Sequence, residues 1–175
     1  MSDAVALPAQ GSRFWSAPST ARLLALLLPA ALLAGAFGSE YFGGLVPCEM
    51  CWWQREAHMV ALVMAALAFT APATTARSRA LVLFAAAAIA VSGTIGVYHA
   101  GVEAGVFEGF TQCTATATGG SNAELLQQII HAPVVRCDEV QFRFLGISMA
   151  GWNAILSLGG AALILLLALR RGRRA

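Results

Sequence analysis

Four long stretches without a charged residue most constrain what this chain can fold into. They are residues 23–39, 57–76, 80–102 and 144–169. A helix that crosses the hydrocarbon layer of a membrane needs about 17–25 apolar residues, and all four stretches meet this length, the first only just. Apolar residues make up 58% of the chain and charged residues only 11%. So few charges exclude a soluble monomer, and so much apolar sequence excludes intrinsic disorder.

We therefore expect an all-α integral membrane protein, a four-transmembrane-helix bundle formed by residues 21–169. The expected spans lie near 21–42, 53–71, 80–99 and 146–169, with outward loops at 43–52 and 100–145. Pro29 predicts a kink within the first span. A cleaved signal peptide is the alternative for that span, but its apolar stretch exceeds the usual length of about 7–15 residues and a polar tail, residues 1–20, precedes it.

The placement of arginine predicts how the spans are oriented. Eight of the 11 basic residues fall on the side that receives both termini and the loop 72–79, together with a single acid, Asp3. The opposite side carries three arginines and eight acids. Because positive residues stay on the cytoplasmic side, we expect both termini there. The basic tail, residues 170–175, is expected to contact anionic lipid and not nucleic acid.

The second outward loop is long enough to contain structure of its own. Ser121 or Asn122 can cap a short helix over residues 123–131, with aliphatic side chains on one side and Pro133 after its end. Such a helix could lie on the membrane surface or pack on the outer end of the bundle.

All four cysteines fall in the outward loops, where disulfides persist. Cys48 and Cys51 form a C-x-x-C at the start of the second span. The helix N-terminus and the charge of Arg55, one turn further on, favour a thiolate at Cys51. Because two intervening residues constrain the chain little, the pair predicts a redox-active centre, with an inert disulfide as the alternative.

The second pair, Cys113 and Cys137, encloses 23 residues. Taken alone, it is typical of a disulfide that stabilises a loop. On the same membrane face as a reactive dithiol, it could instead exchange with that dithiol through thiolate attack. A zinc site built from all four cysteines is a further alternative, although zinc half-sites separate their cysteines by about two to four residues.

Two histidines lie near the outward membrane surface. For His58, one turn beyond Arg55, we favour an interfacial histidine over a catalytic one. His99, which follows Tyr98, is equally consistent with an interfacial position and with binding of an electron acceptor.

At this point the chain resembles the DsbB family of disulfide bond formation proteins. The residues that carry the resemblance are Pro47–Arg55, Tyr98–His99, Cys137, Phe144–Met149 and Trp152, within residues of about 20–170. The order of the two cysteine pairs separates the chain from the vitamin K epoxide reductase family, in which the loop pair comes first. Glu49 departs from the pattern, because an acid inside the C-x-x-C should oppose thiolate formation.

The resemblance implies a thiol:quinone oxidoreductase of the bacterial inner membrane, with its cysteines in the periplasm. The partner would be a periplasmic DsbA-like thiol oxidase, whose thiolate attacks Cys113 and frees Cys137. Cys137 would then attack Cys48, and Cys51 would pass two electrons to ubiquinone or menaquinone from the membrane quinone pool.

By the same resemblance, Arg55, His99 and Met149 match positions that line the quinone site, and no metal is implied. Met149 also has an ordinary explanation as a residue that fills the space between helices. The competing class is a non-enzymatic membrane subunit with structural disulfides or with a zinc site formed by the four cysteines.

Overall fold

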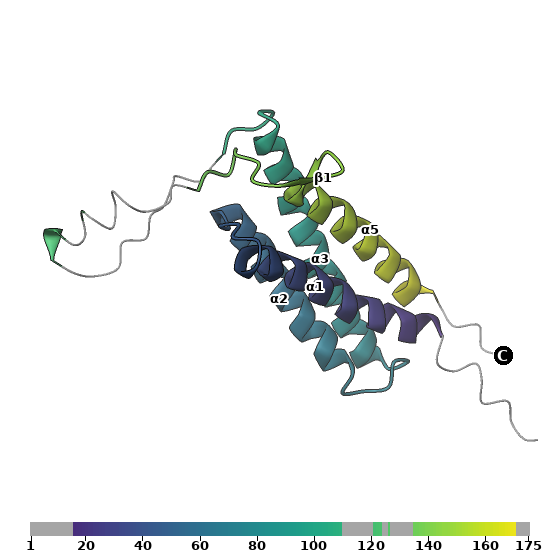
Figure 1. Cartoon of the computed structure of the whole chain (residues 1–175). Coiled ribbons are helices and arrows are strands. Elements are labelled where there is room, and N and C mark those ends of the chain that lie inside the picture. The colour runs from purple at the N-terminus through teal and green to yellow at the C-terminus, as the bar shows by residue number, and fades with distance from the viewer. Residues whose placement is uncertain (1–15, 110–120, 124–125, 127–134, 171–175) are drawn as a thin grey trace, which may run out of the picture.

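The computed structural model describes residues 16–109, 121–123, 126 and 135–170. Four long helices make up most of this part of the chain, namely α1 (Ala17–Tyr41), α2 (Glu49–Ala68), α3 (Ala76–Glu103) and α5 (Met149–Leu169). They pack lengthwise into a single bundle, and a small antiparallel hairpin lies above the start of α5 (Figure 1). The short helix expected over 123–131 falls largely outside the described residues, and Cys113 falls wholly outside them.

The long helices are those of a membrane protein. By length and composition, α1, α3 and α5 are apolar enough to cross a membrane. The first turns of α2 contain Gln54, Arg55, Glu56 and His58, and these polar residues keep α2 below that level of hydropathy. The chain is therefore an all-α membrane protein with four helices, of which three are long apolar candidate spans.

The hairpin before α5 was not expected from the sequence. Strands β1 (Arg143–Phe144) and β2 (Ile147–Ser148) pair antiparallel across a two-residue loop. Both loop residues, Leu145 and Gly146, have positive φ, as a type I′ turn requires. As a result α5 begins at Met149, three residues after the start of the expected span.

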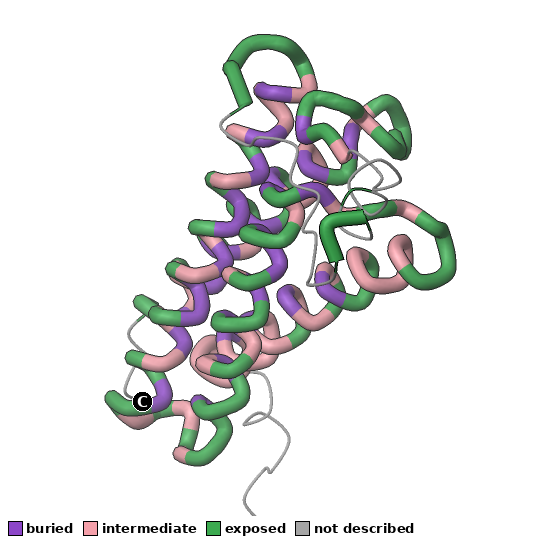
Figure 2. The backbone as a smooth tube through the Cα atoms, turned by 90° about the vertical axis from the view of Figure 1, so that its left-hand side faces the viewer, coloured by how far each residue is buried: buried purple, intermediate pink, exposed green. Residues whose placement is uncertain are grey.

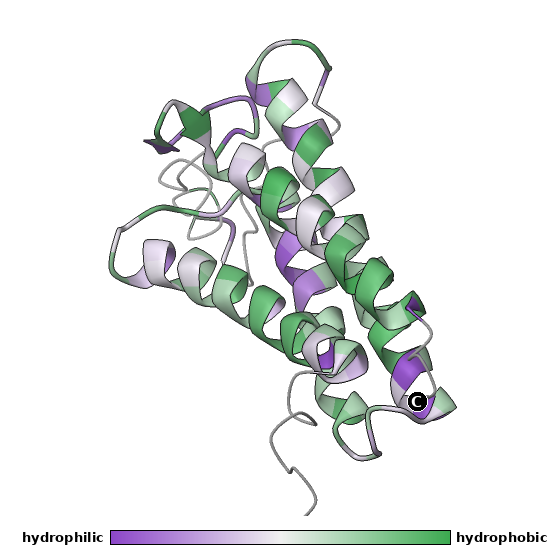
Figure 3. Ribbon diagram, turned by 90° about the vertical axis from the view of Figure 1, so that its right-hand side faces the viewer, coloured by the Kyte–Doolittle hydropathy of each residue, from purple (hydrophilic) through white to green (hydrophobic). Residues whose placement is uncertain are grey.

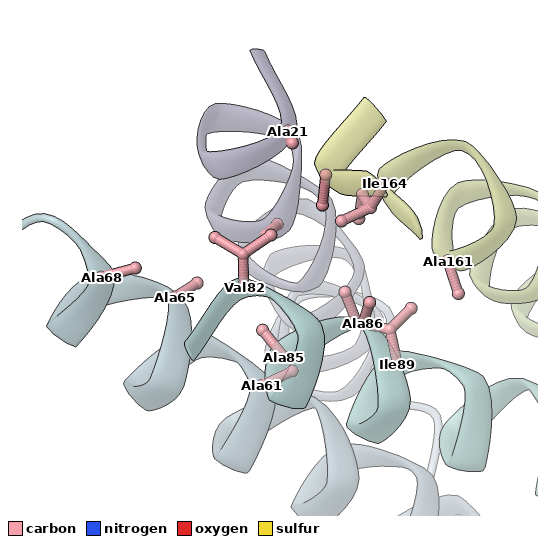
Figure 4. Close-up of a cluster of buried hydrophobic side chains, with 12 residues drawn as sticks. Ala21, Ala61, Ala65, Ala68, Val82, Ala85, Ala86, Ile89, Ala161 and Ile164 are labelled. Atoms are coloured by element: carbon pink, nitrogen blue, oxygen red, sulfur yellow. The ribbon is translucent and has the colours of Figure 1, made fainter. Parts of the chain in front are cut away.

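Small side chains form most of the interior of the bundle (Figure 4). The core cluster comprises Ala21, Ala25, Ala61, Ala65, Ala68, Val82, Ala85, Ala86, Ile89, Ala161, Ile164 and Ala168. In a membrane, where lipid is as apolar as the core, such residues favour association by letting helix backbones approach closely. Buried positions accordingly follow the inner faces of the helices, and exposed positions follow the outer faces (Figure 2).

The helices do not contribute equally to the bundle. α3 packs extensively against α2 and α5, whereas α1 has far less contact with α3. Toward its C-terminal end, α1 diverges from the other three helices (Figures 2 and 3). The largely apolar α1 therefore faces the more polar N-terminal part of α2 (Figure 3), and a pocket lies between them at the end of the bundle where α2 begins.

A glycine on α3 sets the close approach of α3 to α5. A Cβ atom added at Gly96 would lie 3.0 Å from the Ala150 carbonyl oxygen and 3.1 Å from the Ala154 nitrogen. Both neighbours are backbone atoms of α5, which cannot move aside as a flexible side chain can.

We expect Gly96→Val to destabilise the protein by about 1–3 kcal/mol, because the added methyl groups overpack this contact. Thermal unfolding in detergent measures the effect. Gly159→Val on α5 is the matched control, since a Cβ there meets nothing within 4 Å. Equal melting temperatures for the two variants would contradict the proposed close packing.

Candidate active site

Cys48 and Cys51 face each other at the start of α2. Cys48 is the N-cap residue and is only 4% exposed, whereas Cys51 is partly exposed. The two sulfur atoms are 2.9 Å apart, and the backbone N–H of Cys51 donates to the Cys48 sulfur at 3.3 Å. Neither residue is bonded to another described cysteine in this structure, so the two are described as a dithiol.

The environment makes the two thiols unequal. The pKa of Cys51 is lowered, first because its sulfur accepts a hydrogen bond from Cys48 and further because of the Arg55 charge. The pKa of Cys48 is raised, because it keeps the proton that it donates to Cys51 and because it is buried. Cys51 is therefore the more acidic thiol of the pair. The charge of Glu103 opposes this effect, because it raises the pKa of Cys51.

Cys137 lies in the same cluster as the dithiol. It is buried and packs with Cys48, Met50 and Val102, with Cys51 partly buried beside them. Cys48 and Cys137, which are far apart in the sequence, thus meet at the end of the bundle where α2 begins.

Arg55 connects the start of α2 to the end of α1. Its guanidinium forms an ion pair with the Glu40 carboxylate and donates to the Ala36 carbonyl oxygen at 3.0 Å. The same group lies over the rings of Phe37 and Trp52, at 4.8 Å and 5.0 Å from their centroids. The side chain is 6% exposed, so α1 holds a buried positive charge close to Cys51.

His99 of α3 contacts the dithiol from the side opposite α1. Its Nε2 lies 3.6 Å from the Cys48 sulfur and 3.8 Å from a Glu103 carboxylate oxygen. Its Nδ1 lies 2.9 Å from the side-chain nitrogen of Gln54, which can only donate. The hydrogen of His99 is therefore on Nε2, on the side of Cys48.

Sequence reasoning missed the polar junction that supports His99. Asn153 of α5 donates to the Gln54 side-chain oxygen at 2.7 Å and to the Ser92 backbone and hydroxyl oxygens at 3.2 Å. Ser92 in turn donates to the Gln54 carbonyl oxygen at 3.0 Å. The spacing of polar residues in the sequence could have indicated this junction. Two pairs lie four residues apart, and so on one face of a helix, namely Gln54 with His58 and Asn153 with Ser157.

A cavity of about 600 Å³ lies between α1 and the other three helices. One wall is apolar and comes from residues 31–36 of α1. The opposite wall contains Cys48, Cys51, Gln54, Arg55, His58 and His99. Met149 and Asn153 of α5 also line it. The described residues thus bring Cys48, Cys51, Arg55, His99 and Met149 to one cavity, whose size is typical of a small-molecule site.

A metal ion is the alternative occupant of the dithiol. The ligand atoms of Cys48, Cys51 and His99 lie within 4.8 Å of one another. Tetrahedral zinc with Zn–S distances of about 2.3 Å would hold two sulfurs about 3.8 Å apart. The described residues bring three such ligands together, one fewer than a closed structural zinc site takes, and their two sulfurs are closer than that distance, at 2.9 Å.

A reactive dithiol beside an apolar cavity in a bundle of membrane helices defines a class of membrane-bound disulfide oxidoreductases. Comparison with known families agrees, since residues 18–167 match the family model "Disulfide bond formation protein DsbB". The chain belongs to the DsbB family of disulfide bond formation proteins. This membership implies disulfide oxidoreductase activity and a multi-pass membrane location.

Individual relatives support the assignment. Disulfide bond formation protein B of Methylococcus capsulatus is 33% identical over 151 residues, which cover 84% of this chain and 92% of that protein. Disulfide bond formation protein B of Marinobacter nauticus is 31% identical over 140 residues, covering 75% and 80% of the two chains. An uncharacterized protein of Rickettsia prowazekii is 24% identical over 129 residues, covering 72% and 73%. No solved structure matches the chain significantly.

In the reduced protein we expect iodoacetamide to modify Cys51 before Cys48. The lowered pKa of Cys51 keeps its thiolate at pH values where an ordinary thiol is protonated, and the raised pKa of Cys48 keeps that residue protonated. Timed alkylation across a pH series, followed by mass spectrometry of the peptides, measures both rates.

Arg55→Gln should move the Cys51 profile to higher pH, because it removes the positive charge. Arg22→Gln is the matched control, since Arg22 donates to the Ala71 carbonyl oxygen beyond the far end of α2. Equal reactivity of the two cysteines would contradict the assigned thiolate.

Proposed function

We propose that this protein is an inner-membrane thiol:quinone oxidoreductase that reoxidises a periplasmic DsbA-like thiol oxidase. The observation that carries the proposal is the position of the dithiol, whose thiolate Cys51 lines a largely apolar cavity within a membrane helix bundle. In such a position, Cys51 can react with an electron acceptor that is dissolved in the hydrocarbon layer of the membrane.

We infer that α2 is the fourth span. Its polar residues Gln54, Arg55 and His58 are buried in the bundle, whereas the exposed side chains further along α2 are apolar. They are Met59, Val60, Val63 and Leu67. With the arginine-rich side in the cytoplasm, both termini are cytoplasmic and the four cysteines are periplasmic.

Electrons enter this path through the second cysteine pair. The partner's thiolate attacks Cys113 of a Cys113–Cys137 disulfide, forms a mixed disulfide and releases Cys137 as a thiolate. Cys137 then attacks Cys48 of a Cys48–Cys51 disulfide and releases Cys51. The packing of Cys137 beside Cys48 supports this order, and the lowered pKa of Cys51 makes it the better leaving group.

The cavity residues fit a quinone, either ubiquinone or menaquinone. The α1 wall offers apolar surface for a ring and tail, and two buried nitrogens on the other wall, Arg55 Nε and His58 Nδ1, have no partner among the described residues. Arg55, His99 and Met149 would hold the ring. A bound quinone supplies the two-electron acceptor.

Residues around the dithiol position and stabilise it as the electron donor. Arg55 stabilises the Cys51 thiolate, and its ion pair with Glu40 keeps the guanidinium in place. Gln54 orients His99 so that its Nε2 hydrogen lies on the side of Cys48. The apolar wall of α1 excludes water from the dithiol.

Purified protein should oxidise a DsbA-like dithiol only when a quinone is supplied. Cys51→Ser should lower the rate of this oxidation by at least about a hundredfold, because it removes the residue that donates electrons to the quinone. Quinone absorbance and partner thiol content measure the two halves of the reaction. Retention of full activity by Cys51→Ser would contradict the proposal. Loss of activity on metal chelation would favour a zinc site instead.

The order of the cysteines has a separate test. In Cys137→Ser, Cys113 is a free thiol that should attack the disulfide of the oxidised partner and displace one partner sulfur as a thiolate. The resulting mixed disulfide should survive non-reducing electrophoresis, because Cys137 is no longer present to resolve it. Cys113→Ser, the matched control, should trap none.

A further inference from the structure

His58 occupies an unusual place for a histidine in a membrane helix. It lines the same cavity as the dithiol, and its side chain is 3% exposed. It lies seven residues beyond Cys51 on α2, which corresponds to about 10 Å along the helix axis. Both residues line the cavity, from positions about two turns apart on α2. Polar groups buried at membrane depth are by default candidates for function.

The polar junction fixes which nitrogen of His58 carries the hydrogen. The Asn153 side-chain nitrogen is directed at the oxygens of Gln54 and Ser92, so its side-chain oxygen is left to accept. His58 Nε2 lies 2.9 Å from that oxygen and must donate to it. Ser157 donates to the same oxygen at 2.9 Å. Nδ1 of His58 therefore carries a lone pair.

That lone pair is not used within the described part of the protein. Nδ1 is buried and accepts no hydrogen bond from any described residue. A buried polar atom without a partner destabilises a protein, so a ligand that supplies the missing hydrogen bond is favoured there. The ligand that fits is one with a hydroxyl group, because only a donor can pair with this nitrogen.

We propose that His58 Nδ1 accepts a hydrogen bond from a ring hydroxyl of the hydroquinone, so that the cavity binds the reduced carrier more tightly than the oxidised one. This inference rests on the proposed function. In the overall reaction two thiols lose two electrons and two protons and form one disulfide, and the quinone gains both and becomes a hydroquinone. Quinone ring oxygens can only accept hydrogen bonds, whereas hydroquinone hydroxyls can also donate them. His58 therefore discriminates between the two forms.

The discrimination changes the driving force for oxidation of the dithiol. A site that binds the product of reduction more tightly than the substrate raises the reduction potential of the bound carrier. For a two-electron couple, each tenfold preference corresponds to about 30 mV. This preference would help to oxidise a partner that is itself a strong oxidant.

Two substitutions separate this role from a structural one. His58→Gln places an amide near Nε2 that can still donate to Asn153, but it removes the acceptor at Nδ1. His58→Asn places an oxygen near Nδ1 and removes the donor to Asn153. Ser157→Ala is the control for the junction itself, since Ser157 contacts Asn153 and His58 but does not line the cavity.

The test compares the binding of ubiquinone-1 and ubiquinol-1 by anaerobic calorimetry in detergent. All variants carry Cys51→Ala, which prevents electron exchange during the titration. We expect His58→Gln to weaken ubiquinol-1 binding about five- to tenfold and to change ubiquinone-1 binding by less than about twofold. His58→Asn and Ser157→Ala should keep most of the preference for ubiquinol-1.

Each other outcome has a definite meaning. If the Cys51→Ala parent binds both ligands equally, or if His58→Gln leaves the ratio of the two dissociation constants unchanged, the role of His58 is wrong and the proposed function stands. If Ser157→Ala abolishes the preference as strongly as His58→Gln, the junction and not Nδ1 is responsible. If the parent binds neither ligand, the quinone site itself is wrong.

Discussion

The side chain of Asn153 joins three helices, and the geometry of the site depends on this junction. It donates to Gln54 of α2 and to Ser92 of α3, and it accepts from His58 and Ser157. A membrane interior offers no water to these groups, so each must find its partner within the bundle. Because Asn153 donates to the side-chain oxygen of Gln54, the side-chain nitrogen of Gln54 faces His99. These two amide orientations determine which ring nitrogen carries the hydrogen in His58 and in His99.

A second contact completes the cavity from the other side. The ion pair between Arg55 and Glu40 holds the end of α1 near α2, although α1 otherwise diverges from the bundle. The cavity therefore has one apolar wall and one wall with directed polar atoms. This asymmetry suits an apolar ring compound, which needs apolar surface for most of its atoms and a few hydrogen bonds for its orientation.

Much of this arrangement could be predicted from the sequence. Charge-free stretches predicted the helices, and the C-x-x-C with Arg55 predicted a reactive Cys51, because both signals are local. The β1–β2 hairpin was not predicted, because strands of two residues are too short to show the alternating pattern that distinguishes a strand from a loop. Asn153 and His58 escaped as well, because their importance comes from contacts between helices that are far apart in the sequence. His58 was expected to be an interfacial residue, whereas it is buried in the wall of the cavity.

The most direct test of the account is a single-turnover measurement on protein in which Cys113 and Cys137 are replaced by serine, so that Cys48 and Cys51 are the only redox pair. The fully reduced variant is mixed with one equivalent of ubiquinone-1, without any partner protein, and quinone absorbance and free thiols are followed together. The account predicts that one quinone is reduced for each Cys48–Cys51 disulfide formed. Unchanged quinone and two persistent thiols would contradict it.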